Sequence, residues 1–424
     1  MSFVQRVRSV TVRRASYFAL AALITAPCLA VADEVFTVRD TVAVTGSPLV
    51  SFDISWVDPY IHTYFLSDRS NSAVDVVDTK THTMVNQFKA SFAGNTGNND
   101  TSGPNGVLSL DNRGTVQVWA GDGPTTADTS CGETTCSTVK VFAFPSGTLL
   151  HTIPTHGVRR ADELCHDPAD HLIQIANDAE ADVSGHNPYV SFISTDTYKV
   201  LGTLSFPEAT NGIEQCQWSE RTGLIYLNIP EVNGTGGDTT DGNVVVIDPR
   251  RMEVIKRFDI PVTECAGPQG MALGPDDQIL LGCNAASQPP GTGQNAAVID
   301  AHNGKITALL TGLGGDDEVW FNPGDGHYFL AGGSYLPNEQ LGVVDSARDT
   351  PDETILIGTA NGTTRRAHSV AADETTNEVY LPVPATGGGT PGFTSTICGA
   401  LAAQGCIAVF KANHDDPPVF VRRF

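Results

Sequence analysis

Seven polar residues recur along this chain at similar spacing, and their side chains are of kinds that bind cations or transfer protons. Each opens a short apolar stretch, and neighbours are 48 to 57 residues apart: Asp53, Asn105, Asp162, Glu214, Gln269, Asp317 and His368. Carboxylate and amide oxygens are the ligands that hard cations prefer. His368 is the only member whose ordinary pKa lies between about 5 and 8. A fold that gathers the seven would therefore offer cation binding and general acid–base chemistry.

The elements that position these residues form a repeated outline, which is clearest in Arg159–Asn177. A polar opening leads into a short apolar strand, a turn at Asp167-Pro168 and a second apolar strand. Two more strands follow in each repeat, and the third often ends in two apolar residues and an aspartate, as in Val76–Asp78. Apolar and polar residues alternate at period two in the segments between Gly, Asn and Asp turn residues, which indicates strands. Seven such repeats predict an all-β fold, a seven-bladed β-propeller of four-stranded blades.

A terminal strand is expected to close the ring. Val35–Thr45 alternates and precedes the first repeat, and the last strands are expected at about Cys406–Phe410 and Val419–Phe424. Pairing of Val35–Thr45 with the last blade would remove an exposed sheet edge. The unbroken repeat predicts one domain over residues 33–424, with no helix longer than about three turns.

Residues 1–32 are expected to be a signal peptide. An arginine-rich start is followed by the apolar run Tyr17–Leu29 and by the small residues Ala30-Val31-Ala32. The run is short for a membrane span. We therefore expect an exported protein, periplasmic or secreted, without a membrane span.

The composition excludes some partners. The formal charge of the chain is −23, and removal of four arginines with residues 1–32 gives −23 − 4 = −27. So acidic a surface disfavours nucleic acid and anionic membranes, which both require positive charge. The expected partner is a small-molecule substrate or a protein or glycan of the cell envelope, and a monomer is expected.

Eight cysteines follow residue 32, an even number that predicts disulfides in an exported protein. Cys131–Cys136 and Cys398–Cys406 are expected pairs that each bracket a small loop. Cys265–Cys283 is expected to flank two strands of the fifth repeat, and Cys165–Cys216 to join the first strands of neighbouring repeats. A cysteine metal site is disfavoured, because no pair has CxxC spacing.

The repeats resemble known propeller groups. The segments Phe65–Asp68 and Leu224–Asn228, each followed by an apolar strand ending in aspartate, are similar to YVTN-type seven-bladed propellers, which include secreted bacterial proteins. The opening Gly267–Gly270 resembles the SMP-30/gluconolactonase and NHL groups. The SMP-30-like resemblance implies a divalent cation in the central tunnel, held by residues that open the inner strands. This chain departs from those enzymes in blade number and in several of the residues at these positions.

Two interpretations of the seven openings stay open. In a propeller the first strands line the axis, so the openings converge, and their carboxylates need either raised pKa values or a cation. A cation site would use Asp53, Asn105, Asp162, Glu214, Gln269 and Asp317, with Glu163 and Glu318 as alternative ligands. Calcium suits so many oxygens better than zinc, because one histidine is available. In the alternative, the residues bond loops between blades and surround a water-filled channel.

Two arginine pairs precede Asp162 and His368 at matched spacing: Arg159-Arg160 and Arg365-Arg366. Arg160 and Arg366 could bind a substrate carboxylate or phosphate through two parallel hydrogen bonds. Alternatively they pair with the carboxylates at the openings and hold the neighbouring loops.

Three function classes follow. The leading one is a metal-dependent lactone or ester hydrolase, in which the metal polarises the carbonyl and His368 or Glu214 is the general base. The second is a non-catalytic YVTN-type binding propeller of the cell envelope that uses its rim loops. The third is a propeller lyase that grips a carboxylated substrate with Arg160 and Arg366. No GxSxG, HExxH or Walker motif supports a serine hydrolase, a zincin or an NTPase.

Overall fold

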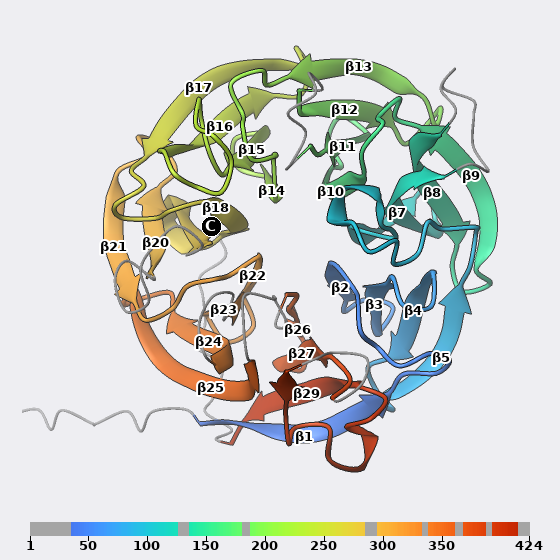
Figure 1. Ribbon diagram of the computed structural model, residues 1–424. Helices are drawn as coiled ribbons and strands as arrows, with labels where there is room; N and C mark the ends of the chain where they lie inside the picture. Colours follow the sequence, from blue (N-terminus) through green and yellow to red (C-terminus); the bar gives the residue numbers. More distant parts are fainter. Residues whose placement is uncertain are drawn as a thin grey trace, which may run out of the picture. The chain divides into compact units, whose positions relative to one another are not determined.

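The computed structural model describes residues 35–125, 135–179, 187–284, 295–332, 338–360, 368–386 and 392–413. They form seven β-sheets arranged in a ring around a central axis (Figure 1). The predicted all-β, seven-bladed propeller is therefore confirmed. The helices among the described residues are single 3₁₀ turns at Asn99–Thr101, Pro275–Asp277 and Gly399–Leu401. None of the helices in the described part of the chain is long and apolar enough to cross a membrane.

The innermost strand of each blade is short and lines the axis. In blades 1 to 7 these strands are β2 (Ser55–Asp58), β6 (Val107–Asn112), β10 (Ala161–Asp167), β14 (Cys216–Ser219), β18 (Pro268–Leu273), β22 (Glu318–Asn322) and β26 (Ala371–Asp373). The second strands run antiparallel to them, so each second strand ends beside the opening of its partner. They are β3 (Thr63–Asp68), β7 (Thr115–Thr125), β11 (Leu172–Asn177), β15 (Leu224–Ile229), β19 (Gln278–Cys283), β23 (His327–Gly332) and β27 (Glu378–Val383).

The third and fourth strands differ in burial. The third strands are β4 (Ala73–Asp78), β8 (Cys136–Ala143), β12 (Tyr189–Ser194), β16 (Gly242–Asp248), β20 (Asn295–Asp300), β24 (Asn338–Asp345) and β29 (Cys406–Ala412). Both faces of second and third strands are covered by neighbouring blades, which explains their nearly continuous apolar sequences. The fourth strands are β5 (Thr83–Phe88), β9 (Thr148–Pro154), β13 (Val200–Ser205), β17 (Glu253–Ile260), β21 (Ile306–Thr311), β25 (Thr350–Ala360) and β1 (Phe36–Ala43). They are more exposed, and β13, for example, alternates between partly buried and exposed residues.

The N-terminal strand closes the ring, as expected. β1 pairs antiparallel with β29, from Phe36 opposite Ala412 to Ala43 opposite Cys406, and is the outermost strand of blade 7. Figure 1 shows this blue strand beside the red strand β29. The predicted strand Val419–Phe424 lies outside the described residues. Blade 6 carries one strand more than expected, β28 (Phe393–Thr394), which pairs with the end of β25.

The aspartates that end the third strands shape the turns that follow. Asp78 Oδ1 accepts hydrogen bonds from the main-chain N–H groups of Lys80 and Thr81, both at 2.9 Å. Asp248 and Asp345 each accept two such bonds from their own turns. A short carboxylate that satisfies its own turn favours a tight connection. The repeated apolar-apolar-aspartate pattern therefore has a structural role on the face opposite the strand openings.

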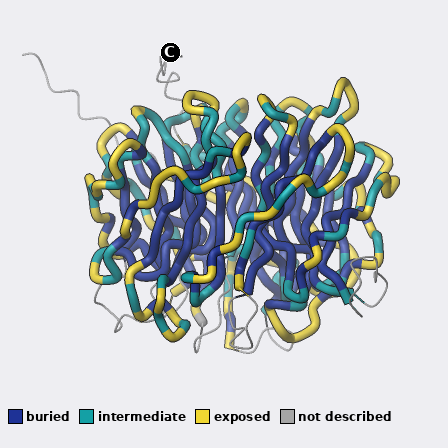
Figure 2. The backbone as a smooth tube through the Cα atoms, turned by 90° about the horizontal axis from the view of Figure 1, so that it is seen from above, coloured by how far each residue is buried: buried dark blue, intermediate teal, exposed yellow. Residues whose placement is uncertain are grey.

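The core consists of seven apolar clusters, one between each pair of neighbouring blades. The cluster between blades 3 and 4, for example, packs Phe192 and Phe206 against Ile225 and Val245, all fully buried. Figure 2 shows buried strands in the layer between the two faces of the ring and exposed turns on both faces. Because each blade packs on two neighbours, closing the ring by β1 completes the last cluster, between blades 7 and 1.

Three of the expected disulfides are present. Cys165–Cys216 joins the innermost strands of blades 3 and 4, Cys265–Cys283 brackets the first hairpin of blade 5, and Cys398–Cys406 closes a small loop in blade 7. Cys136 is also disulfide-bonded, whereas Cys131 lies outside the described residues. Disulfides indicate an oxidising compartment, as expected for an exported protein. The predicted signal peptide, residues 1–32, also lies outside the described residues.

Candidate functional site

The seven predicted residues all stand at or just before the innermost strands, at one end of the channel. Six of them are buried, with exposed fractions of 6% or less: Asp53, Asn105, Asp162, Glu214, Gln269 and Asp317. The His368 side chain keeps 14% of its surface exposed. The openings therefore converge on the axis, as the propeller geometry requires.

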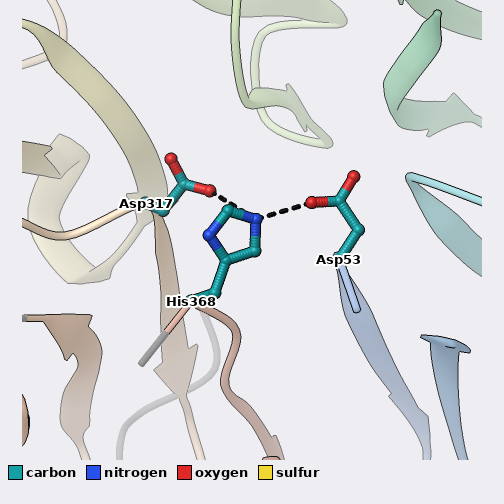
Figure 3. Close-up of side chains that lie close together, drawn as sticks. All are labelled: Asp53, Asp317 and His368. Atoms are coloured by element: carbon teal, nitrogen blue, oxygen red, sulfur yellow. Dashed lines mark hydrogen bonds and ion pairs between the residues drawn. The ribbon is translucent and has the colours of Figure 1, made fainter. Parts of the chain in front are cut away.

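Three of the seven residues place their donor atoms close enough together to hold one metal ion. His368 Nε2 lies 2.6 Å from Asp53 Oδ1 and 2.9 Å from Asp317 Oδ2 (Figure 3). One ligand atom from each residue lies within 4.8 Å of the other two, and no other group of three such residues in the described ranges meets this criterion. The three come from blades 1, 6 and 7, so only ring closure brings them together. We call Asp53, Asp317 and His368 the triad.

An arginine that the spacing of the openings did not reveal supports the triad. Arg69 follows β3 directly and pairs through Nη2 with Asp53 Oδ2. Its Nη2 and Nε also donate to Asn105 Oδ1, at 2.6 and 3.1 Å. Because a second strand ends beside the opening of the first, a basic residue directly after Phe65–Asp68 was a signal that sequence reasoning missed. Because Arg69 pairs with Oδ2 of Asp53, the other oxygen, Oδ1, contacts His368. The side-chain oxygen of Asn105 is bonded to Arg69.

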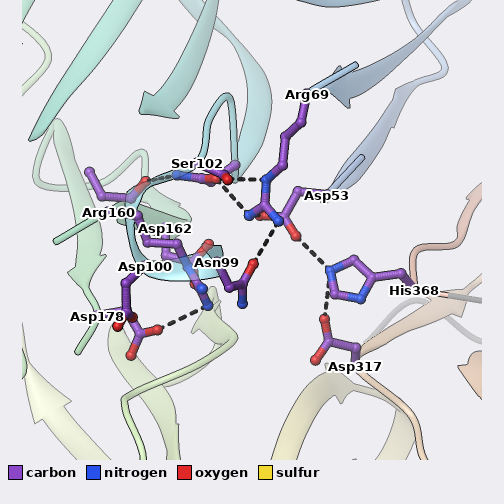
Figure 4. Close-up of polar contacts among 12 residues, drawn as sticks. Asp53, Arg69, Asn99, Asp100, Ser102, Arg160, Asp162, Asp178, Asp317 and His368 are labelled. Atoms are coloured by element: carbon purple, nitrogen blue, oxygen red, sulfur yellow. Dashed lines mark hydrogen bonds and ion pairs between the residues drawn. The ribbon is translucent and has the colours of Figure 1, made fainter. Parts of the chain in front are cut away.

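Arg160, predicted to bind substrate, makes ion pairs inside the protein. Its Nε lies 2.7 Å from Asp162 Oδ2, and its Nη2 lies 2.9 Å from Asp178 Oδ2 (Figure 4). The side chain is buried, and these ion pairs are of the kind that the structural alternative for Arg160 predicts. Its predicted counterpart Arg366 lies outside the described residues.

The connection between blades 1 and 2, residues 89–106, adds polar groups to the same half of the ring. Asn99 Oδ1 accepts a hydrogen bond from Arg69 Nη1 at 2.7 Å, and the main-chain oxygen of Asp100 accepts one from Arg160 N at 2.7 Å. Both residues belong to the single 3₁₀ turn at Asn99–Thr101. The openings of blades 1 to 3 are thereby filled by arginines and their partners.

The other half of the ring is rich in acids and amides. Gln269 Nε2 donates to Glu214 Oε1 at 3.3 Å. Directly beyond the openings, Gln215 Oε1 accepts from the main-chain N–H of Met271 at 2.5 Å and Val319 at 3.4 Å, across blade 5. This crossing requires glycine at position 270, because a Cβ there would lie 2.6 Å from the Val319 side chain. A second layer of side chains therefore links blades 4, 5 and 6 next to the ring of openings.

Glu318 belongs to this second layer. Its Oε2 accepts hydrogen bonds from Ser369 Oγ, from Val370 N at 3.1 Å and from Ser55 N at 3.4 Å. These contacts join blade 6 to blades 7 and 1. Burial nevertheless raises the pKa of Glu318 to about 8, against the lowering effect of these hydrogen bonds.

The charges of the triad and Arg69 stabilise one another. Burial alone would lower the pKa of His368, but the Asp317 and Asp53 carboxylates outweigh it and raise the pKa to about 10. The imidazole thus carries a proton at neutral pH in this arrangement. Burial would raise the pKa of Asp53, but Arg69 and His368 hold it below its ordinary value.

Other carboxyl groups of the site favour the neutral form. Burial raises the pKa of Asp162 to about 7 despite the charge of Arg160. Burial, reinforced by Asp317, raises the pKa of Asp316 to about 8. Burial and the charges of Glu214, Asp162, Asp317 and Glu318 raise the pKa of Glu163 well above its ordinary value. Cationic side chains therefore compensate part of the predicted acidic cluster, and protonation or a bound cation must compensate the rest.

The predicted six-residue cation site divides into smaller groups. Asp53 and Asp317 meet His368, Asn105 binds Arg69, Asp162 binds Arg160, and Gln269 binds Glu214. His368, which was predicted as a general base, is therefore also a candidate metal ligand. The triad is the one group in the described part of the chain whose donor atoms fit a single metal ion.

No protein-family model matches this sequence, and no curated protein matches it. The seven-bladed fold is a property of the structure itself, and the similarity to YVTN-type and SMP-30-like propellers remains an expectation from sequence motifs.

Proposed function

We propose that this protein binds a divalent cation at the triad, at the polar end of its central channel, and acts there on a small substrate. The observation that carries the proposal is the convergence of one ligand atom each from Asp53, Asp317 and His368 within 4.8 Å. Arg69 supports it, because it holds the second oxygen of Asp53 and so fixes the orientation of that carboxylate.

The donor set bears on the identity of the metal. Calcium takes six to eight oxygens, whereas the triad supplies two carboxylates and one imidazole nitrogen. Imidazole with carboxylates suits manganese, iron or zinc. Calcium, expected from the larger oxygen set, is therefore one member of a panel rather than the favoured ion.

Hydrolysis of a lactone or another ester is the reaction class we propose. A divalent cation would supply polarisation of the carbonyl and of a bound water. His368, as a ligand or as the imidazolium, is not available as a base at neutral pH, so Glu214 remains the predicted base. Arg69 and Arg160 maintain the positions of Asp53 and Asp162 through their ion pairs.

Metal binding is tested by calorimetric titration of chelator-treated protein with Ca²⁺, Mg²⁺, Mn²⁺ and Zn²⁺. One equivalent of one ion is expected to bind, and Asp317→Asn and His368→Ala are each expected to lower its affinity at least tenfold. Glu220→Gln, which removes an exposed charge from a turn, should leave the affinity unchanged. Failure of all four ions to bind would overturn the metal site.

Activity is tested by screening the metal-loaded protein against lactones, aryl esters and phosphotriesters. The proposal expects turnover that chelator abolishes and the same ion restores. Glu214→Gln should reduce the rate without releasing the metal. Turnover that survives complete removal of metal would contradict the mechanism.

A non-catalytic binding propeller is the second candidate, and one observation favours it. The cationic side chains of Arg69, Arg160 and His368 pair with the carboxylates of Asp53, Asp162 and Asp317 and so neutralise part of their charge. If neither metal nor turnover is found, saturable binding of an envelope protein or glycan through the rim loops is the expected activity.

Export is part of the proposal. The disulfides support it, because they form in oxidising compartments. Cleavage after residue 32, a periplasmic or secreted location and a monomeric state are proposed with it.

A further inference from the structure

His82 bridges the seam between blade 1 and blade 7, where the ring closes. It belongs to the turn between β4 and β5 in blade 1, and β5 lies beside the closing strand β1 at this seam (Figure 1). Its Nδ1 lies 3.1 Å from Asp40 Oδ2 on β1, and its Nε2 lies 3.1 Å from Glu378 Oε2 on β27. Because β29 separates β1 from β27 in the sheet, one imidazole joins blade 1 to two different strands of blade 7.

Both nitrogens of this imidazole face carboxyl oxygens, so the arrangement needs an extra proton. An ionised carboxylate only accepts hydrogen bonds, and a neutral imidazole has one N–H and one lone pair. Both contacts are therefore satisfied by the imidazolium, or by uptake of the same proton on Asp40 or Glu378. When that proton leaves, a nitrogen lone pair faces a carboxylate oxygen at 3.1 Å. The bridge then keeps only one of its two hydrogen bonds.

Most of the bridge is shielded from water. The side chains of His82 and Glu378 are 10% and 6% exposed, whereas that of Asp40 is 51% exposed. The Tyr380 ring packs edge-on against the imidazole, with centroids 6.3 Å apart, and its hydroxyl donates to Glu378 Oε2 at 3.2 Å. Hydrogen bonds between charged groups are roughly twice as strong as those between neutral groups. Loss of the proton therefore weakens a sheltered contact rather than an exposed ion pair.

The neighbouring groups on β1 do not replace the charge of the imidazolium. Arg39 Nε lies 3.3 Å from Glu378 Oε1, but the arginine side chain is 53% exposed. The main-chain N–H of Thr41 donates to Asp40 Oδ1 at 2.7 Å. This hydrogen bond, together with His82 and Arg39, holds the pKa of Asp40 below its ordinary value against the effect of burial. Asp40 is therefore a carboxylate that faces the imidazole.

The remaining charged groups at the seam have other roles. Burial, with the charges of Glu378 and Asp373, raises the pKa of Tyr380, so its hydroxyl keeps its proton and donates it. Asp78 precedes the turn of His82 and accepts hydrogen bonds from main-chain N–H groups of that turn. Imidazole is the side chain that ordinarily changes charge between about pH 5 and 8. In the described part of the seam, the bridge is thus the contact whose geometry requires a proton of this kind.

We propose that His82, Asp40 and Glu378 form a proton-dependent clasp that fastens the closing strand β1, tight in acid and looser as the pH rises. The closed seam holds the extra proton and an opened seam releases it, so the contribution to closure is complete at low pH and is lost with rising pH. The clasp lies on the face opposite the strand openings, whereas the contact between Asp53 and His368 joins the same two blades at the openings. The inference does not depend on metal binding by the triad.

Hydrogen–deuterium exchange of the whole protein tests the clasp, because protection of main-chain N–H groups reports local opening. Protection factors, which divide out the intrinsic pH dependence of exchange, are measured for β1 at pH 5 and pH 8. Those of β13, the outermost strand of blade 3, are the internal reference for changes in global stability. Relative to β13, protection of β1 is expected to fall about tenfold, the effect of losing one hydrogen bond to a charged group.

Two variants remove the need for the extra proton. In Asp40→Asn the side-chain oxygen can still accept from Thr41 N, and the amide N–H can donate to an imidazole nitrogen that has lost its proton. In His82→Gln the amide offers N–H donors that do not titrate. The fall in protection is expected to disappear in both. His302→Gln removes a histidine that pairs with Asp277 at 60% exposure and should behave as wild type does.

The exposed position of Asp40 keeps the test decisive. Asp40→Asn is expected to fold, because half of that side chain faces water, and it decides the result if His82→Gln does not fold. Equal protection of β1 relative to β13 at pH 5 and pH 8 in wild type would overturn the proposal. A fall that persists in Asp40→Asn would also overturn it, because the titrating proton would then lie outside the clasp.

Discussion

Arg69 is the residue that most changes how the ring of polar openings is understood. The acids predicted to need a metal are partly neutralised by this buried side chain, which contacts Asp53, Asn105 and Asn99. A buried charge that loses its partner is strongly destabilising, because desolvation is no longer offset. The ion pair therefore determines both the stability of the site and the direction of Asp53 Oδ1.

Replacement of Arg69 by methionine is expected to cost about 3–5 kcal/mol in the free energy of unfolding, since it leaves Asp53 buried without its cation. Chemical unfolding of wild type and variant measures the loss. Arg113→Met is the control, because Arg113 pairs with Asp196 at 72% exposure and such surface pairs contribute about 1 kcal/mol or less. Equal effects of the two replacements would contradict the role assigned to Arg69.

Asp316 and Glu318 predict an unusual pH dependence of stability. Their folded-state pKa values of about 8 lie above ordinary values of 3.8 and 4.5, so the folded protein keeps protons that the unfolded chain releases. Their contribution is complete below the ordinary values and is lost as the pH rises towards 8. His368 acts in the same sense at higher pH, between 6.5 and about 10.

The free energy of unfolding contributed by these groups is therefore expected to fall between about pH 4.5 and pH 8. Urea unfolding at several pH values measures the slope, which should be flatter in Asp316→Asn and Glu318→Gln. Glutamine at position 318 keeps an acceptor for Val370 N, so the variant is expected to fold. Slopes identical to that of wild type in both variants would show that these carboxyls ionise normally.

At the scale of the elements, disulfides hold strands of the site end together. Cys165–Cys216 encloses a sequence separation of 51 residues and joins two blades, whereas Cys265–Cys283 spans 18 residues within one blade. Loop-closure entropy then predicts losses of about 4 and 3 kcal/mol on removal.

The double variant Cys165→Ala/Cys216→Ala is expected to lose about 4 kcal/mol of stability, and Cys265→Ala/Cys283→Ala is its matched control. Because the first crosslink closes the longer loop, its removal should cost more stability than removal of the second, as urea unfolding measures. Equal losses in the two double variants would show that loop length does not determine the contribution of these crosslinks.

The closing strand β1 is the second element with a testable role. It covers the edge of β29 and contributes Phe36 and Val42 to the clusters on either side of blade 7. Deletion of residues 35–43 should expose that edge and lower the melting temperature by more than ten degrees, on the order expected for several kcal/mol. Differential scanning calorimetry measures this, and an unchanged melting temperature would show that ring closure does not need β1.

At the scale of the whole molecule, the disulfides indicate an oxidising compartment. An exported chain cleaved after Ala32 would begin at Asp33, and intact-mass measurement of protein recovered from the periplasm or medium tests this. The recovered chain is expected to lack the four arginines of residues 1–32 and to carry eight oxidised cysteines. Recovery of the uncleaved chain with free thiols would contradict export.

Much of the fold was readable from the sequence by itself. The spacing of Asp53 to His368 gave seven blades, the alternating segment Val35–Thr45 gave the closing strand, and cysteine positions gave three observed pairs. These features depend on local periodicity and on positions within one repeat. A repeat unit restricts where its neighbours can pack, so the pattern of one blade predicts the ring.

Only the tertiary structure decided which polar residues meet. His368, Asp53 and Asp317 come from three blades, and Arg69 reaches Asn105 from the end of another strand. The repeat predicts that all openings face the axis, but not the side-chain directions that select partners among them. Those directions depend on desolvation and on competition between ion pairs, which act over distances in space rather than along the sequence. The sequence thus determined where a site lies, and the packed ring determined which of its carboxylates pair with which cationic side chains.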